Sequence, residues 1–228
     1  MSGSRSLSER LARLPTGAQE MPPDFVARGQ RERIVAAMTD LVAERGYRKT
    51  TIEAIGKTAR VALSTFYEHF DDKEACFLAA FDESVEAARE VFAGLIDPER
   101  PWPEQIATGL QVFLEMVVAE QARAKLCLVE AQAAGSAALA RYQSMLESVA
   151  PKLREGRELN PRAARLPDGL EVAIAGGLAW LVHQRLVADR AGDLEALLPE
   201  MLQVTLTPYV GDAEAGQAAR EAEARLAA

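Results

Sequence analysis

Apolar residues recur at intervals of three and four along most of this chain, a spacing that places side chains on one face of an α-helix. Gly and Pro residues interrupt the pattern, and no segment of strict alternation competes with it. The expected helices cover residues 24–45, 51–59, 62–70, 72–94, 103–119, 121–134, 136–155, 168–190 and 193–210. The sequence therefore predicts an all-α protein with about nine helices.

The charge is distributed unevenly along the chain. Its 228 residues carry a formal net charge of −8. Residues 28–60 nevertheless contain eight Lys and Arg against four Asp and Glu, and the acidic excess lies after residue 81. A basic segment within an acidic chain is the distribution expected when only one part of the protein binds nucleic acid.

Composition excludes several classes of protein. The chain is 49% hydrophobic and 26% charged, which is typical of a globular protein and too apolar for disorder. No apolar run approaches the roughly 20 residues that span a bilayer. The N-terminus also lacks the apolar core of a secretion signal. We therefore expect a cytoplasmic protein with no membrane partner.

Few residues are available for catalysis or metal binding. His69 and His183 are the only histidines, and the spacing of Cys76 and Cys127 fits neither a metal site nor a disulfide framework. A carboxylate–histidine set, a nucleophile motif and a Gly-rich phosphate loop are not apparent. We expect no cofactor and no metal, and an enzyme built on a helical bundle is a disfavoured alternative.

Residues 51–73 predict a helix-turn-helix, with two short helices joined by a tight turn at Arg60. The second helix of such a unit can enter a DNA major groove. In a helical projection Phe66 points inward and Glu68 lies on the opposite side. The side chains with donors suited to phosphate oxygens and base edges are Ser64, Thr65, Tyr67, His69 and Lys73.

This segment resembles the tetracycline-repressor (TetR) family of bacterial transcription regulators over roughly residues 28–78. The resemblance rests on the run T-I-x-x-I followed by V-x-x-x-T-F-Y-x-H-F-x-x-K-E. It implies a homodimer with three DNA-binding N-terminal helices and a variable C-terminal part that dimerises and binds an effector. It also implies a phosphate clamp of Thr51, Thr65, Tyr67, His69 and Lys73, with base contacts from Leu63, Ser64 and Glu68.

The chain departs from the family pattern at several positions. Arg60 stands where the family usually has Gly, Ala62 where it has a capping Ser or Thr, and Ser64 where Gly is common. Arg60 either strains the turn or adds a phosphate contact. Ala62 forfeits a cap worth about 1 kcal/mol. Glu68 repels phosphates unless it accepts a hydrogen bond from a cytosine amino group, so we expect operator preference to depend on it.

The chain divides into four expected segments. These are a flexible arm (1–23), a DNA-binding domain (24–71), an effector-binding and dimerisation domain (72–210) and a mobile tail (211–228). Several residues of the third segment either line an effector cavity or fill the core: Phe113, Met116, Cys127, Glu130, Tyr142 and Trp180. The chain is only 6% aromatic, and the apolar residues of its third segment are mostly aliphatic, so we expect an apolar or amphipathic effector.

The last two predicted helices suggest a dimer interface. Their repeated apolar spacing suits a four-helix contact between two copies, whereas the alternative is that both helices cover the core of one copy. The predicted interface residues are Leu170, Ile174, Gly177, Leu181, Leu194, Leu198, Met201 and Thr205. Gly177 lies in mid-helix, where glycine costs about 1 kcal/mol unless backbones approach closely.

The sequence thus predicts a repressor that binds a palindromic double-stranded DNA operator as a homodimer and is released by a small molecule. A second interpretation is a helical interaction protein that retains the helix-turn-helix without binding DNA. The salt dependence of DNA affinity distinguishes the two, because phosphate contacts weaken steeply as salt rises.

Overall fold

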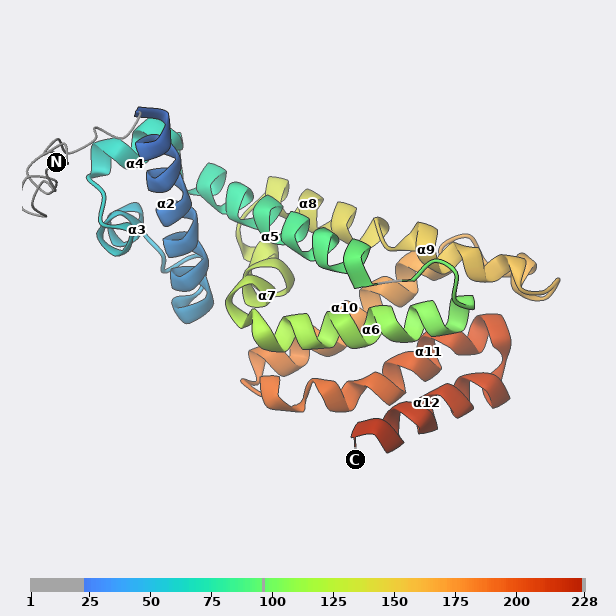
Figure 1. Cartoon of the computed structure of the whole chain (residues 1–228). Helices are drawn as coiled ribbons and strands as arrows, with labels where there is room; N and C mark the ends of the chain where they lie inside the picture. The colour runs from blue at the N-terminus through green and yellow to red at the C-terminus, as the bar shows by residue number, and fades with distance from the viewer. Residues whose placement is uncertain (1–22, 96, 227–228) are drawn as a thin grey trace, which may run out of the picture.

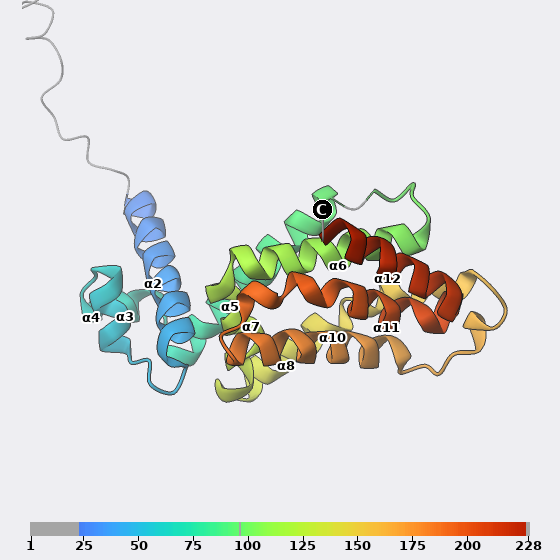
Figure 2. The ribbon, with the colours of Figure 1, turned by 90° about the horizontal axis from the view of Figure 1, so that it is seen from below.

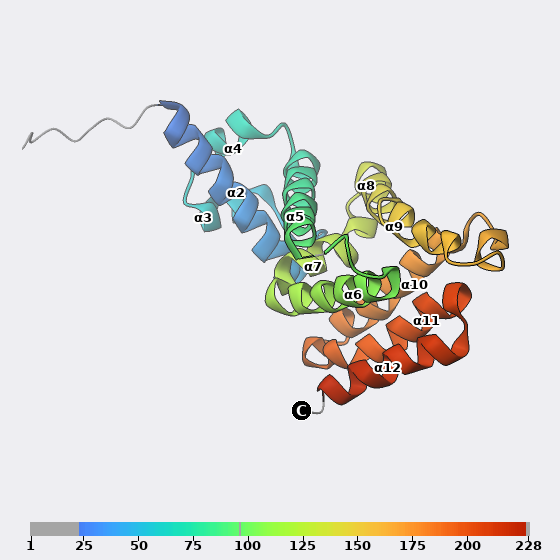
Figure 3. The same cartoon turned by 45° about the vertical axis from the view of Figure 1, so that its right-hand side comes forward.

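The computed structural model describes residues 23–95 and 97–226, and the elements in these ranges are helices (Figure 1). Helices α2 (Pro23–Arg45), α3 (Ile52–Ala59) and α4 (Leu63–His69) form a unit that we call the head. Helix α5 (Lys73–Leu95) leads from the head to the rest of the chain (Figure 3). The predicted all-α fold is confirmed. The arm expected over residues 1–23 lies outside the described residues apart from Pro23, which begins α2.

The helices after α5 form the body. They are α6 (Trp102–Ala119), α7 (Gln121–Leu128), α8 (Ser136–Glu147), α9 (Ala150–Arg154), α10 (Leu170–Val187), α11 (Leu198–Val210) and α12 (Asp212–Leu226). Five 3₁₀ turns lie between them: η1 (Glu130–Ala133), η2 (Glu155–Glu158), η3 (Ala163–Arg165), η4 (Ala191–Asp193) and η5 (Glu195–Leu197). Helix α11 lies between α10 and α12 (Figure 2). In the described part of the chain, no helix has the length and apolarity needed to cross a membrane.

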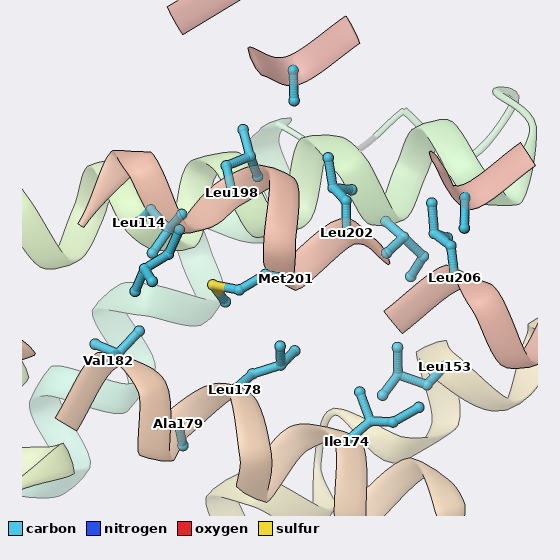
Figure 4. Packing of buried hydrophobic residues seen from close by; sticks show 14 of the residues in the cluster. Leu114, Leu153, Ile174, Leu178, Ala179, Val182, Leu198, Met201, Leu202 and Leu206 are labelled. Carbon is cyan, nitrogen blue, oxygen red and sulfur yellow. The ribbon is translucent and has the colours of Figure 1, made fainter. Parts of the chain in front are cut away.

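Two clusters of buried apolar side chains hold the head and the body. The head cluster joins α2, α3, α4 and the first half of α5, and it includes Ile34, Met38, Ile55, Phe66 and Phe77. In the body cluster, the side chain of Met201 of α11 lies between Leu114 of α6 and Leu178 of α10 (Figure 4). Helix α7 belongs to both clusters, because Leu126 is buried in the first and Leu128 in the second.

Three predicted helices are shorter than expected. The helix expected over 136–155 breaks, and Pro151 lies in the first turn of α9. The helix expected over 193–210 begins late, with Pro199 in the first turn of α11. Proline is tolerated in a first turn because the N–H groups there have no intrahelical partner. The helix expected over 121–134 is divided into α7 and the 3₁₀ turn η1.

The tail expected over 211–228, as a frayed helix or a disordered segment, is helical for most of its length. Residues 212–226 form α12, which packs along α11. The contact uses Ala215, Ala219 and Ala222, which recur at helical spacing and are buried. Small side chains allow two helices to approach closely, so this helix packs without large apolar residues.

The predicted dimer interface is also wrong for most of its members. Buried in the body of a single chain are Ile174, Leu194, Leu198, Met201 and Thr205. Leu170 and Leu181 are half-buried, and Gly177 is exposed. The most apolar face of each helix therefore packs into its own core, as the alternative interpretation held for these residues.

A buried ion pair ties the loop before α10 to α10 and α11. The Glu171 carboxylate is fully buried, and the Arg157 guanidinium donates to it at 2.6 and 3.0 Å. Arg157 also donates to the carbonyl oxygens of Leu166 and Pro167 at 2.6 and 2.7 Å. The Tyr209 hydroxyl donates to the same carboxylate at 3.2 Å. These hydrogen bonds, with that from Arg157 the strongest, hold the pKa of Glu171 below its usual range.

We expect Arg157→Met to destabilise the fold by about 3–5 kcal/mol, because it leaves the Glu171 carboxylate buried without its partner. The double variant Arg157→Met/Glu171→Leu should be less destabilised than the single variant, since it removes the unpaired charge as well. Urea denaturation at neutral pH measures both free energies of unfolding. A cost below about 1 kcal/mol for the single variant would contradict this account.

Candidate nucleic-acid interface

The helix-turn-helix is defined by its two caps. The Thr51 side-chain oxygen accepts a hydrogen bond from the Ala54 N–H at 3.3 Å and begins α3. Helix α3 ends at Ala59, and the next residue, Arg60, is its C-cap. The φ of 57° and ψ of 47° of Arg60 lie in the left-handed region. Helix α4 begins after Ala62, which provides no side-chain cap. The turn therefore contains Arg60 and Ala62, two of the three residues at which the sequence departs from the family pattern.

Helix α4 has one buried face and one exposed face. Phe66 is fully buried and Phe70 is nearly so, which confirms the projection made from the sequence. The exposed side chains are Leu63, Ser64, Tyr67 and Glu68, whereas Thr65 and His69 are half-buried. Side-chain atom Nε2 of His69 is buried without a hydrogen-bond partner. The predicted base-reading residues thus share one accessible surface.

Lys73 does not have the free ammonium group that the resemblance implied. Its Nζ donates to the carbonyl oxygens of Tyr47 and Thr50 at 3.0 and 3.1 Å. It also lies 3.9 Å from the centre of the Tyr47 ring. This partial burial lowers the pKa of Lys73. An ammonium has three donors, so the two carbonyls leave one for a phosphate.

Other cations of the head are exposed. They are Arg28, Arg48, Lys49, Lys57 and Arg60. Three further cations have partners within the chain. Arg31 pairs with Glu83, and the exposed Arg45 pairs with Glu44 at 3.6 Å. Arg33 is also exposed and donates to the Ala59 carbonyl oxygen at 3.1 Å. Except for Arg60, these exposed cations were not among the predicted site residues. The local positive charge of residues 28–60 was the signal that could have identified them.

The predicted effector residues of the body separate into three environments. Phe113 and Tyr142 are half-buried beside the body cluster, and Met116 is half-buried in α6. Cys127 is buried, and this burial raises the pKa of its thiol to about 12. Trp180 is 53% exposed and points away from the interior.

Glu130 does not face a ligand space in this structure. Its Oε2 atom accepts a hydrogen bond from the Tyr47 N–H in the head at 2.8 Å. In the described residues, no group of three or more His, Cys, Asp and Glu side chains is arranged to hold a metal ion.

The second half of α5 is loosely covered. The first half buries Cys76, Phe77, Ala80 and Phe81, but no residue from 82 to 95 is buried. Val91 and Leu95 are 41% and 55% exposed despite their apolar side chains. This half of α5 therefore presents apolar surface that its own chain does not cover.

The comparisons with known proteins agree on the fold. The model of the bacterial regulatory proteins of the tetR family matches residues 34–80. No curated protein matches the chain.

Several solved structures are similar over most of their length. The fatty acid degradation regulator FadR from Bacillus halodurans is 20% identical with a TM-score of 0.67, and the match covers 84% of this chain and 97% of that one. FadR from Bacillus subtilis in complex with stearoyl-CoA is 20% identical with a TM-score of 0.62, covering 79% and 98%. A gamma-butyrolactone receptor is 20% identical with a TM-score of 0.63, covering 87% and 98%.

The matched segment contains α3, α4 and their turn, which are the elements that carry the exposed Leu63, Ser64, Tyr67 and Glu68. The three structures share the arrangement of helices in both the head and the body. Residues 34–80 thus match the model of the bacterial regulatory proteins of the tetR family, and the structures similar over most of the chain share its fold.

Proposed function

We propose that this chain is a ligand-responsive transcriptional regulator that represses by binding a palindromic DNA operator as a homodimer. The observation that carries the proposal is the exposed surface of α4, which holds Leu63, Ser64, Tyr67 and Glu68 on a helix anchored by the buried Phe66. An exposed helix of this kind can enter the major groove and contact base edges. DNA binding belongs to residues 24–71, and effector binding and dimerisation to residues 72–210.

Phosphate contacts come from residues around this surface. Thr51, Thr65, Tyr67 and His69 supply hydroxyl and imidazole groups, and Lys73 supplies its remaining donor. The exposed Arg60 at the end of α3 adds a cation. Such contacts fix the position of the head on the duplex, whereas Glu68 accepts from a cytosine amino group and contributes to base selection.

The effector is apolar or amphipathic in this proposal. The loosely covered half of α5, with Val91 and Leu95, offers apolar surface. A long acyl chain is one ligand that would cover such a surface, and the Bacillus subtilis FadR structure holds stearoyl-CoA. An effector shifts the equilibrium between DNA-bound and released forms only by its differential affinity for the two.

The dimer interface lies on the exposed side of α10. Val172, Trp180 and Val187 are 39%, 53% and 61% exposed, and they lie on the side opposite the buried Ile174 and Leu178. A side chain at Gly176 or Gly177 would meet nothing within 4 Å in this chain. Close approach of a second copy explains these mid-helix glycines, which the monomer does not.

Selection of bound duplexes from random DNA, with purified protein at near-physiological salt, tests the proposed function. We expect enrichment of a two-fold-symmetric site, because each subunit of a symmetric dimer presents the same α4 surface. Folded, dimeric protein that enriches no sequence would contradict the proposal and favour the interaction-protein interpretation.

Arg60→Gly separates strain from phosphate binding. Glycine adopts the left-handed conformation without the steric cost of a side chain, so the variant should be about 1 kcal/mol more stable. Loss of one phosphate contact should weaken binding to all duplexes alike and reduce the slope of log affinity against log salt by about 1. Urea denaturation and salt titrations of affinity measure the two effects. An unchanged salt slope would remove Arg60 from the interface.

Gly177→Arg should dissociate the dimer without disturbing the monomer. The new side chain enters open space in a single chain and improves helix propensity, but it obstructs a second copy. Gly94→Arg is the matched control, because Gly94 lies in α5 and also has open space around it. Sedimentation velocity reports the oligomeric state. If Gly177→Arg remains as dimeric as the control, the interface lies elsewhere.

A further inference from the structure

The loop between α2 and α3 connects the head to the body through Tyr47. The Tyr47 N–H donates to the Glu130 carboxylate at 2.8 Å, and its carbonyl oxygen accepts from Lys73 at 3.0 Å. Its ring packs edge-on against Phe77, with ring centroids 5.2 Å apart. Glu130 lies 83 residues further along the chain, in η1 of the body. The loop is therefore held by both α5 and the body.

The position of this loop determines where α3 begins. Thr50 is buried, its hydroxyl donates to the Gly46 carbonyl oxygen at 3.0 Å, and its own carbonyl oxygen accepts from Lys73 at 3.1 Å. The next residue, Thr51, is the N-cap of α3. Gly46 has a φ of +84°, and a Cβ atom there would lie 3.3 Å from Oε2 of Glu130. A glycine at this point allows the carboxylate to reach the Tyr47 N–H.

Glu130 is itself linked to the exposed side of α10. Two residues before it, the Leu128 carbonyl oxygen accepts a hydrogen bond from Nδ1 of His183 at 2.9 Å. This carbonyl lies in the last turn of α7, where carbonyl groups lack intrahelical partners. The His183 ring stacks on Trp180, with centroids 5.1 Å apart and planes 14° apart. A continuous set of contacts thus runs from α10 through the end of α7 to the head.

We propose that Glu130 is the positioning residue through which the end of α7 holds the helix-turn-helix. The Glu130 carboxylate fixes the Tyr47 N–H, and the loop that contains Tyr47 fixes the N-cap of α3. His183 fixes the Leu128 carbonyl, two residues before Glu130. Movement at α10 is thereby transmitted to the start of α3. The regulatory role of this joint rests on the proposed function. In that function α10 forms the dimer interface, and the joint relates α10 to the spacing of the two DNA-binding heads.

Amide hydrogen exchange in the DNA-free protein tests the joint. Glu130→Ala should accelerate exchange in residues 46–58 by about tenfold or more, because it removes a charge-assisted hydrogen bond from the loop. His183→Ala should accelerate the same residues, although it lies in α10. The double variant should show no further acceleration, since both changes break one set of contacts.

Controls separate this role from general destabilisation. Glu130→Gln retains an oxygen acceptor and should restore most of the protection in residues 46–58. If Glu130→Ala fails to fold, His183→Ala serves as the test variant, with the same acceleration expected. Glu147→Ala, on the exposed end of α8, should leave these residues unchanged.

Three results would overturn the proposal: unchanged exchange in Glu130→Ala, unchanged exchange in His183→Ala, or accelerations that add in the double variant. The measurement uses no DNA, so it is independent of the selection experiment. If the protein enriches no DNA site, the proposed function fails, and the exchange measurement still decides whether this joint exists.

Discussion

The last turn of α7 is the point on which the arrangement of this protein depends. Leu126 packs into the head cluster and Leu128 into the body cluster, and they are separated by one residue. Two cores that share one short helix cannot move independently without disturbing buried apolar contacts. The head is therefore attached to the body by packing, and the hydrogen bonds of Tyr47 lie at the edge of that shared region.

The helix-turn-helix of the head was the more predictable part, because α3 and α4 are short and their turn chemistry is local. The 3.6-residue period places Phe66 inside and Glu68 outside, and the structure agrees. The Thr51 cap was also visible in the sequence, because a cap acts within three residues. The hydrogen bonds of Lys73 within the head could not be predicted, since its partners, the carbonyls of Tyr47 and Thr50, have no signature in side-chain types.

In the body, the apolar periodicity of the sequence did not determine which surface each helix face packs against. A repeat of three and four identifies the residues that share a face, but not the surface that this face meets. Ile174 and Met201 are on the most apolar faces and lie in the core of one chain, whereas the exposed Trp180 is on the other side of α10. Glu130 could not be paired with Tyr47 from sequence, because the contact joins residues 83 positions apart.

In the proposed dimer, each subunit holds one head rigidly, and each head reads one half-site of a symmetric operator. The affinity of the dimer should be measured for duplexes in which two selected half-sites are separated by different numbers of base pairs. We expect a sharp maximum at one centre-to-centre separation near one helical turn, about 10 base pairs, or a multiple of it. Affinity that does not depend on the separation, or that equals the affinity for one half-site, would contradict it.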